Sequence, residues 1–497
     1  MKQASSISDW SPRLKGRVSL GLLIRLLLLL LIPFHIHPTT IQSALFDSPQ
    51  VKAQTCSIKN FHQNLSFLSG AAPISTSEFI SRRNNLGKAL HIEGLDAFIL
   101  EPGYTFQYYG NISQKDWEPW EPEERPFLMV VEPVVNATSG EIEGKMSFLA
   151  PAFEVGRVRM LGIPVEDEKE ALNIVGWEED WDPYVTLRDG LFAGKKGAKI
   201  MVDEELRDYI GRGLTSAGFE TVGLGGEVEA VRQIKTQPEI EILKAVNTGT
   251  VMAIRAMRPC LTVGLTENQI MEILDNTLLS IGFEPFFDIV LIDENAALPH
   301  GGFVTGNNKI KETSMILIDV GAHYLGYSSD VCRSIFIDPP TRSTWHKLSA
   351  IPPWSATQQT DTEKEAEKDL LKQKLKVWYL VLDAQAAARA QLRPNSTAAS
   401  VDMAAREVIT AAGYGPYFTH RVGHGIGIKA HESPYLNKAN HKTRLRPGMV
   451  FTNEPGVYLT GKFGVRHEDV YLVKESGEAE NLCRKEARDP REPLPPS

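Results

Sequence analysis

The stretch MILIDVGAHYLGYSSDV, residues 315–331, places two aspartates in largely apolar surroundings. Asp319 follows an apolar run typical of a buried strand, where a carboxylate costs several kcal/mol unless it is paired or binds a metal ion. Asp330 lies eleven residues further on, beyond two glycines that allow the chain to turn back as a hairpin. The two strands of such a hairpin would present both carboxylates to one point. Each aspartate taken alone could instead end a strand or cap a turn.

Three later segments place an acid or a histidine in a similar setting. Apolar, strand-like runs precede Glu454 and flank Glu468, and the Pro-Gly pair after Glu454 forces an immediate turn. His424 lies in the segment HRVGHGIG, residues 420–427, whose glycines let the backbone and a bound ion approach closely. Separate extended segments are therefore expected to deliver one potential ligand each.

Four carboxylates and one imidazole form the candidate metal-ligand set, which consists of Asp319, Asp330, His424, Glu454 and Glu468. This set carries too much negative charge for a single structural zinc ion, which prefers four ligands that include sulfur or several histidines. Oxygen ligands with one nitrogen suit two divalent ions, of which Mn²⁺ is the first expectation and Co²⁺, Zn²⁺ or Fe²⁺ are alternatives. Because such centres activate water, hydrolysis is the expected reaction.

The order of these five residues resembles that of the M24 metallopeptidases of the "pita-bread" fold. The flanking motifs agree as well: His-x-x-Gly-His at 420–424, Glu-Pro-Gly at 454–456 and Arg-x-Glu-Asp at 466–469. The sequence is most similar to the proline-specific branch, aminopeptidase P and prolidase, over about residues 77–474. The resemblance implies a creatinase-like α/β N-terminal domain followed by an α+β pita-bread catalytic domain. It also implies hydrolysis of Xaa-Pro bonds in proline-containing peptides.

The resemblance implies a role for each ligand. Asp319 is expected to bind one metal ion, and His424 and Glu454 are expected to bind the other. Asp330 and Glu468 are expected to bridge the two ions.

The same resemblance assigns catalytic roles to residues beside the ligands. His431 is expected to stabilise the oxyanion, because developing negative charge requires a donor already aimed at it. His300 and His420 are expected to position the substrate and its proline. Glu454, besides binding metal, is expected to carry a proton to the leaving proline nitrogen.

Two further charged residues are expected to support the ligands from behind. Arg466, two positions before Glu468, is expected to orient carboxylates. Glu432 follows His431 where relatives often carry aspartate, and this departure leaves the ligands themselves untouched.

A chain of 497 residues is long enough for more than one domain, because single cores stop growing at roughly 250–300 residues. Helical and extended patterns alternate over residues 77–224, with strands expected at 97–100 and 199–202, which predicts an α/β domain. A capping-box pair, Thr236 and Glu239, predicts the start of a long amphipathic helix. This helix opens the expected catalytic domain, residues 226–475.

The catalytic domain is expected to carry an insertion at about residues 339–373, and a polar tail, residues 476–497, follows it. The insertion contains two Pro-Pro pairs and a charge run. In that run like charges recur four residues apart, which argues against a packed helix. We interpret the segment as a solvated loop, and a partner-binding segment is the alternative.

The amino terminus predicts entry into the secretory pathway. Basic residues precede an apolar run at 20–34, which indicates a signal sequence followed by a linker within residues 1–55. The run is shorter than the roughly 20 apolar residues of a membrane anchor, so cleavage is favoured and a signal anchor is the alternative. The protein is therefore expected to be secreted or membrane-anchored. Four sequons, which predict a glycoprotein, begin at Asn64, Asn111, Asn136 and Asn395.

Composition excludes other classes of partner and site. The net charge is −9, and nothing in the composition marks a nucleic-acid partner. The four cysteines are too few and too scattered to predict a disulfide framework or a cysteine metal site, and Cys332 is expected to be a buried structural thiol. Resemblance to dimeric relatives implies a homodimer.

Two kinds of function compete. The first is a Xaa-Pro peptidase, either an aminopeptidase or a dipeptidase (prolidase), which need the same metal centre. A methionine aminopeptidase is less favoured because it lacks such an α/β domain, and a creatinase-like enzyme works without metal. The second kind is a non-catalytic pita-bread module that binds a protein partner, but relatives of that sort have usually lost ligands.

Overall fold

The computed structural model describes residues 48–117, 124–166, 171–337 and 361–494. The expected signal sequence and residues 339–360 of the expected insertion lie outside these ranges. Residues 53–497 group into one compact unit. Among the described helices, none is long and apolar enough to span a membrane.

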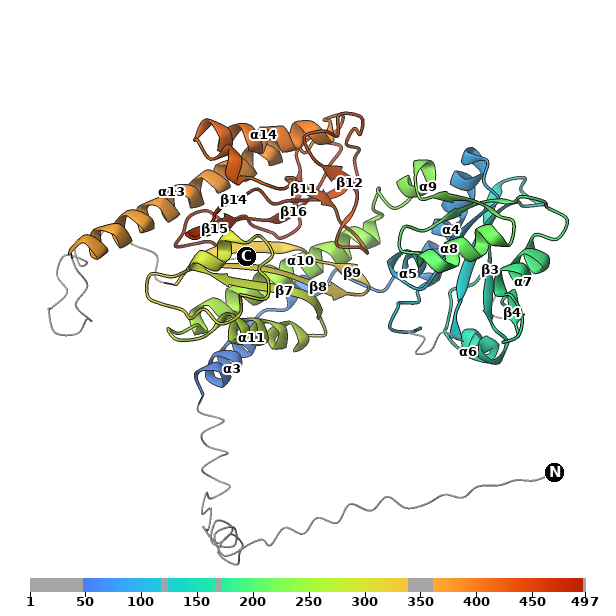
Figure 1. The fold of residues 1–497 in the computed structure, drawn as a ribbon, viewed down its shortest axis with the longest axis horizontal. Coiled ribbons are helices and arrows are strands. Elements are labelled where there is room, and N and C mark those ends of the chain that lie inside the picture. Colours follow the sequence, from blue (N-terminus) through green and yellow to red (C-terminus); the bar gives the residue numbers. More distant parts are fainter. Residues whose placement is uncertain (1–47, 118–123, 167–170, 338–360, 495–497) are drawn as a thin grey trace, which may run out of the picture. The chain divides into compact units, whose positions relative to one another are not determined.

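The N-terminal domain is built on a six-stranded mixed sheet (Figure 1). In spatial order the strands are β4 (Ile174–Trp177), β3 (Ile142–Pro151), β2 (Leu128–Val135), β1 (Ala97–Leu100), β5 (Lys199–Val202) and β6 (Glu220–Gly223). Its helices are α4 (Thr76–Glu93), α5 (Tyr104–Gly110), α6 (Val155–Arg159), α7 (Pro183–Leu191), α8 (Asp208–Ser216) and α9 (Gly226–Ala230). Helix α4 packs on β2 and β3, and α9 packs on α4. The α/β class expected for this domain is confirmed.

The catalytic domain contains two larger sheets and a two-stranded ribbon. One sheet has the order β10 (Val331–Phe336), β8 (Met315–Tyr324), β7 (Glu284–Ile292), with β9 (Tyr327–Ser328) paired to β8. The other has the order β12 (Glu432–Leu436), β11 (Gly423–Gly425), β13 (Val450–Asn453), β16 (Asp469–Leu472), β17 (Glu480–Asn481). The ribbon pairs β14 (Gly456–Leu459) with β15 (Phe463–Arg466).

Four long helices cover these sheets and bury their apolar faces. They are α10 (Gln237–Met257), α11 (Glu267–Leu279), α13 (Asp361–Gln391) and α14 (Ala398–Ala411). The first two pack against β7 and β8, and the last two share a separate core with the five-stranded sheet. The predicted start of α10 is confirmed, since the Glu239 carboxylate accepts from the Thr236 N–H at 2.8 Å.

The hairpin predicted between the two aspartates is present. Strand β8 pairs with β9 through a two-residue turn, Leu325 and Gly326, whose φ angles are 50° and 85°. Positive φ at both central residues matches the twist of tight hairpins. Asp319 lies opposite Cys332 of β10, which is buried as expected, and Asp330 directly precedes that strand.

The charge run of the expected insertion is helical, so the expectation drawn from its like charges is wrong. Helix α13 begins at Asp361 and passes through the run. Opposite charges three residues apart offset the repulsion: Lys368 lies 3.6 Å from Glu365, and Lys372 lies 2.8 Å from Asp369. Pairs at this spacing stabilise a helix as pairs at spacing four do.

The segments at both ends of the expected domains are also ordered. Helix α3 (Pro49–Phe61) includes residues that the sequence assigned to a linker. The expected polar tail adds strand β17 to β16, and it buries Leu482 and Leu494. In the same segment, the Glu486 carboxylate accepts from the Tyr471 hydroxyl at 2.7 Å.

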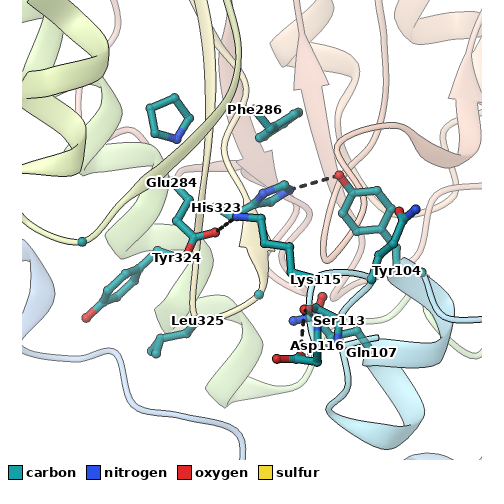
Figure 2. A pocket seen from close by; sticks show the side chains of 15 residues that line it. Tyr104, Gln107, Ser113, Lys115, Asp116, Glu284, Phe286, His323, Tyr324 and Leu325 are labelled. Carbon is teal, nitrogen blue, oxygen red and sulfur yellow. Dashed lines mark hydrogen bonds and ion pairs between the residues drawn. The ribbon is translucent and has the colours of Figure 1, made fainter. Parts of the chain in front are cut away.

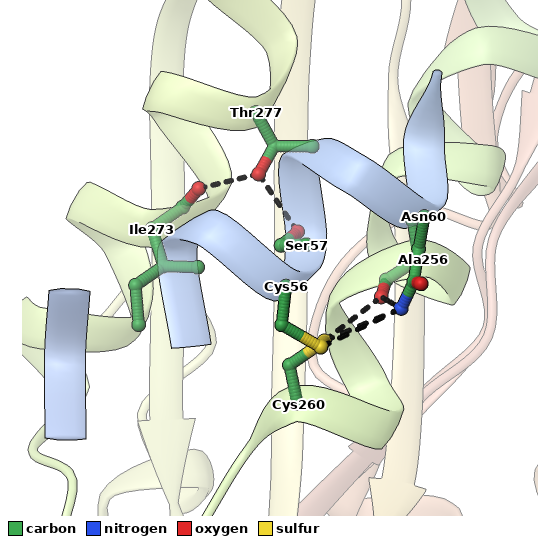
Figure 3. Close-up of a disulfide and its surroundings, with 7 residues drawn as sticks. All are labelled: Cys56, Ser57, Asn60, Ala256, Cys260, Ile273 and Thr277. Atoms are coloured by element: carbon green, nitrogen blue, oxygen red, sulfur yellow. Dashed lines mark hydrogen bonds between the residues drawn. A yellow bond between two sulfur atoms is a disulfide. The ribbon is translucent and has the colours of Figure 1, made fainter. Parts of the chain in front are cut away.

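One disulfide joins Cys56 of α3 to Cys260, just beyond α10, across 204 residues (Figure 3). The amide of Asn60 donates to the Cys260 sulfur at 3.3 Å, and the hydroxyls of Ser57 and Thr277 pair at 2.8 Å. The cysteines thus form one covalent link, which is not a disulfide framework and which their number and spacing did not predict.

Candidate metal centre

The five candidate ligands converge from the two larger sheets. Asp319 and Asp330 come from the β8–β10 hairpin, His424 from β11, Glu454 from the end of β13 and Glu468 from the start of β16. Asp319, Asp330 and Glu468 offer oxygens that all lie within 4.8 Å of one another. His424, Glu454 and Glu468 form a second such group. Glu468 belongs to both groups, so the five residues surround one shared space.

Strand register explains why residues far apart in sequence meet here. In the antiparallel β13–β16 pair, Asn453 lies opposite Asp469, so Glu454 and Glu468 emerge side by side at the same end. The backbone N–H of Glu468 donates to the Cys332 carbonyl at 3.0 Å, which ties this end to β10 and to Asp330. Both aspartates and both glutamates are thereby delivered to the junction of the two sheets.

Arg466 contacts the ligand set from behind. Its buried guanidinium donates to the Asp319 carboxylate, to the Tyr458 hydroxyl at 2.6 Å and to the Pro299 carbonyl at 3.1 Å. The second oxygen of Asp319 is buried and has no hydrogen-bond partner. One carboxylate oxygen is therefore held by Arg466 while the other is left open toward the shared space.

The histidines of the site differ in their surroundings. His420 is held by Tyr458, whose hydroxyl lies 2.8 Å from its Nε2, and its Nδ1 lies 3.9 Å from Glu454. His431 is 55% exposed, and its Nε2 lies 3.7 Å from Asp330. His300 is exposed as well, and its charge affects the pKa of Asp319.

Burial and mutual repulsion set the proton affinity of the acids. Burial, together with neighbouring carboxylates, raises the pKa of Asp330 and of Glu468 well above their ordinary values. Burial also raises the pKa of Asp319, although Arg466 opposes the shift. For Glu454 burial is outweighed by a hydrogen bond from His424 and by the charge of His420, so its pKa falls to about 2. The centre thus combines one acid with a lowered pKa and three acids whose pKa values are raised.

His431 is neutral near pH 7. Although 55% of the His431 side chain is exposed, partial loss of hydration and the neighbouring charges of His424 and Arg421 lower the pKa of His431 to about 4. Its ring lies 4.1 Å from that of His424, centroid to centroid. A neutral imidazole still offers one N–H donor at the open side of the centre.

Glu432 lies on β12 opposite Gly425, the residue after His424, and forms a buried ion pair. Its carboxylate pairs with Lys235, and both side chains are almost fully buried. Lys235 also donates to the Arg232 carbonyl at 2.6 Å. Glu432 therefore holds the segment after His431 to the linker before α10.

Tyr458 is a component of the site that the sequence did not reveal. Its hydroxyl joins His420 to Arg466, and burial raises its pKa. In the sequence it lies within an apolar strand, where a tyrosine looks like an ordinary core residue. The only sequence signal was its nearness to the Glu-Pro-Gly motif.

Comparison with known proteins agrees with this geometry. The model of metallopeptidase family M24 matches residues 241–475. An uncharacterized peptidase of Schizosaccharomyces pombe is 37% identical over 409 residues, which are 82% of this chain and 81% of that protein. A Xaa-Pro dipeptidase of Pyrococcus furiosus is 33% identical over 261 residues, which are 52% of this chain and 65% of that protein.

A solved structure shows the same architecture. The dipeptidase of Pyrococcus horikoshii OT3 superposes with a TM-score of 0.63 at 26% identity, covering 82% of this chain and 98% of that one. The shared fold includes the α/β N-terminal domain and the mixed sheets of the catalytic domain. With its ligand-type side chains gathered at the junction of those sheets, this chain belongs to metallopeptidase family M24.

Proposed function

We propose that this protein is a dinuclear metal-dependent peptidase that hydrolyses Xaa-Pro bonds, acting as a Xaa-Pro aminopeptidase. The observation that carries the proposal is the convergence of four carboxylates and one imidazole. They form groups of three residues in which each residue offers one ligand atom, and these atoms lie within 4.8 Å of one another. Similarity to a Xaa-Pro dipeptidase supports the choice of bond.

The residues present fit a pair of divalent cations. One buried carboxylate oxygen of Asp319 accepts no hydrogen bond, and a cation is the natural partner for such an oxygen. Burial, together with the crowded charges of the neighbouring acids, raises the pKa values of Asp330 and Glu468, and a cation bound between them would offset both causes. We assign Asp319 to one ion, His424 and Glu454 to the other, and Asp330 and Glu468 to both.

Bound there, the two ions supply Lewis-acid activation of the peptide carbonyl and of the attacking water. Mn²⁺ is the cation we propose, because hard oxygen ligands dominate the set. The reaction does not depend on a redox change, so Co²⁺, Zn²⁺ or Fe²⁺ could serve in its place. Metal analysis of the purified protein distinguishes these ions.

The chain's own groups perform the proton transfers and hold the substrate. Glu454 is ionised at neutral pH and can accept a proton from the attacking water and pass it to the proline nitrogen. His431 offers its N–H to the carbonyl oxygen as negative charge develops there. His420, fixed by Tyr458, and the exposed His300 position the substrate.

A dipeptidase is the second candidate, because both the P. furiosus and the P. horikoshii relatives are named as dipeptidases. The decisive experiment compares Ala-Pro with Ala-Pro-Ala-Ala as substrates for the Mn²⁺-loaded protein. An aminopeptidase releases alanine from the tetrapeptide, whereas a prolidase cleaves only the dipeptide. Failure to cleave either peptide would contradict the proposed function.

Two variants connect the activity to the site. Asp330→Asn is expected to abolish cleavage and to lower the bound metal. The matched control is Asp208→Asn, which alters an aspartate on the surface of α8 with 82% of its side chain exposed. A chelator should abolish the activity of wild type and control alike, and added Mn²⁺ should restore it.

We further propose that the protein passes through the secretory pathway and is secreted or anchored by its first residues. The disulfide supports this location, because disulfides persist in oxidising compartments. Three of the four sequon asparagines, Asn64, Asn111 and Asn395, are exposed, which suits glycosylation. A mass loss after enzymatic removal of N-glycans, with N-terminal sequencing, tests both points.

A homodimer is the assembly we propose, as the resemblance to the proline-specific branch implies. Light scattering of the protein that starts at residue 48 measures it, and a monomer at micromolar concentration would contradict it. This boundary keeps α3 and its disulfide intact.

A further inference from the structure

Arg421 is a half-buried arginine near the metal centre whose charge has no acidic partner. Its guanidinium lies over the ring of Tyr435, 5.0 Å from the ring centroid. The Nε atom of Arg421 is buried and has no hydrogen-bond partner, and no carboxylate of the described residues forms an ion pair with it. Buried polar groups are rarely left in this state, so the guanidinium has donors to spare for a ligand.

Strand pairing places this arginine on the side of the metal centre. Tyr435 of β12 lies opposite His424 of β11, and residues opposite each other on antiparallel strands share a face. The ring that carries Arg421 is 38% exposed, so it is open to solvent. The charge of Arg421 also acts on the centre, since it helps to lower the pKa of His431 and opposes the rise in the pKa of Asp330.

The chain around Arg421 is fixed on both sides. The Nδ1 atom of His420 lies 2.7 Å from the Arg421 carbonyl oxygen. The N–H of Val422 donates to the Asp402 carboxylate at 2.9 Å. With its backbone held and its guanidinium resting on Tyr435, the arginine presents its donors before a ligand arrives. Less freedom is then lost on binding.

Other cations of the same domains already have acidic partners. Arg466, behind the ligands, pairs with Asp319. Figure 2 shows Lys115 beside a cavity at the end of β8, where its ammonium group pairs with Glu284 at 2.5 Å. Neither cation has charge left for a substrate, whereas Arg421 does.

Bound metal would not use up the charge of Arg421. Two divalent ions carry four positive charges, which equal the four negative charges of the carboxylate ligands. Arg421 would then remain as a cation beside a balanced centre. A guanidinium matches the two oxygens of a carboxylate, which it binds through two parallel N–H donors.

We propose that Arg421 binds a free α-carboxylate in the leaving part of the substrate, so that short peptides ending close to the proline are preferred. The inference rests on the proposed function and deepens it by naming the substrate class. The carboxylate belongs either to the proline or to the residue after it, and both sources present the same group. Tyr435 is a positioning residue, because it acts through Arg421.

The test compares peptide acids with their C-terminal amides, which lack the negative charge. We measure kcat/KM of the Mn²⁺-loaded protein on Ala-Pro and Ala-Pro-NH₂, and on Ala-Pro-Ala and Ala-Pro-Ala-NH₂. In at least one pair the acid is expected to exceed the amide by at least about tenfold. A preference within the dipeptide pair assigns the carboxylate to proline, and one within the tripeptide pair alone assigns it to the next residue.

Variants connect this preference to the arginine. In Arg421→Met the acid-to-amide ratio is expected to fall by at least about fivefold, chiefly through a higher KM for the acid. Arg421→Lys should recover part of the ratio, because it keeps the charge but loses the paired donors. Tyr435→Ala should lower the ratio less than Arg421→Met does. The matched control is Arg212→Met on α8, where 73% of the side chain is exposed, and it should keep the wild-type ratio.

Product inhibition gives a readout that does not depend on cleavage of the bound peptide. The product of the preferred pair, proline or Pro-Ala, should inhibit wild type at a concentration at least about fivefold below that of its amide, and Arg421→Met should remove this difference. Equal rates on acid and amide in both pairs, or a preference that Arg421→Met retains, would overturn the inference and leave the proposed function intact. Failure to cleave any of the four peptides would contradict the proposed function itself.

Discussion

Asp330 and Glu468 are buried together with two other acids, and neither carboxyl can ionise easily while the others are charged. Two unit charges 4 Å apart interact by roughly 4 kcal/mol at an effective dielectric constant of 20. Cations or protons must therefore accompany the folded centre. The same crowding that suits the site to metal makes the metal-free protein sensitive to pH.

We expect chelation to lower the melting temperature, and to lower it more at pH 8 than at pH 5. The pKa values of Asp330 and Glu468 are raised in the folded state, so the protonated carboxyls contribute stability that is lost as pH rises through those values. Each kcal/mol corresponds to roughly 1 °C in a chain of this length, because the entropy of unfolding grows with the number of residues. Scanning calorimetry of metal-loaded and chelated protein measures the difference.

Asp330→Asn provides the control for that experiment. An amide cannot ionise. The melting temperature of the chelated variant should therefore fall less between pH 5 and pH 8 than that of chelated wild type. Equal melting of chelated wild type at the two pH values would show that the acids do not repel one another as described.

Tyr458 joins a histidine to an arginine, and its hydroxyl is expected to matter more than its ring. In Tyr458→Phe, His420 and Arg466 each lose a partner while the apolar packing stays. We expect kcat/KM on an Xaa-Pro peptide to fall roughly 10–100-fold, as when outer partners of metal sites are removed. The melting temperature should change little, and Tyr209→Phe, on an exposed tyrosine of α8, is the matched control. Activity near that of wild type would show that the Tyr458 hydroxyl does not contribute to the site.

At the scale of elements, the segment between β11 and β12 is fixed from several directions. Ser328 donates its N–H to the Gly427 carbonyl and its hydroxyl to the Ile428 carbonyl, both at 2.9 Å. Lys429 reaches the N-terminal domain, with Glu204 at 2.5 Å and Glu205 at 3.0 Å. Since His431 ends this segment, the N-terminal domain takes part in placing the histidine that we propose stabilises the oxyanion.

A double-mutant cycle tests this link. Lys429→Met, and Glu204→Gln combined with Glu205→Gln, should each reduce kcat several-fold with a smaller change in KM. The triple variant should lose no more of its kcat than Lys429→Met alone, because all three substitutions remove the same interaction. Lys438→Met, on an exposed lysine beyond β12, is the control. Fully additive losses would mean that Lys429 and the two glutamates act separately.

Local sequence patterns predicted the elements whose ends are marked by the residues next to them. The strand at 97–100 is an apolar run between Asp96 and Glu101, the strand at 199–202 holds an apolar run that ends before Asp203, and both are present with these bounds. The five ligand-type residues were found because acids beside buried strands are costly without a partner. The order of the motifs around them then pointed to the family.

Features that depend on the folded chain were not predicted. Cys56 and Cys260 are 204 residues apart, and no local pattern pairs them. Tyr458 acquires its role only when β14 lies beside β15 and brings its hydroxyl to Arg466. The start of α13 was misjudged because pairs at spacing four were weighed without the favourable pairs at spacing three.

At the scale of the molecule, the disulfide holds helix α3 on the catalytic domain. It closes a loop of 204 residues, and such cross-links contribute about 2–5 kcal/mol, chiefly by restricting the unfolded chain. Cys56→Ser combined with Cys260→Ser is therefore expected to lower the free energy of unfolding by that amount. Reductant should lower the melting temperature of wild type but not that of the double variant. A wild type indifferent to reductant would contradict this account.

The segment after the family match is part of the folded body. Strand β17 pairs with β16, and Glu486 joins the Tyr471 hydroxyl to Arg389 of α13 at 2.7 Å. An expression clone ended at residue 475, where the family match stops, would uncover the edge of β16 and the apolar site of Leu482. Bare strand edges recruit other strands, so such a clone should yield inclusion bodies, and the choice of stop codon becomes a decision about solubility.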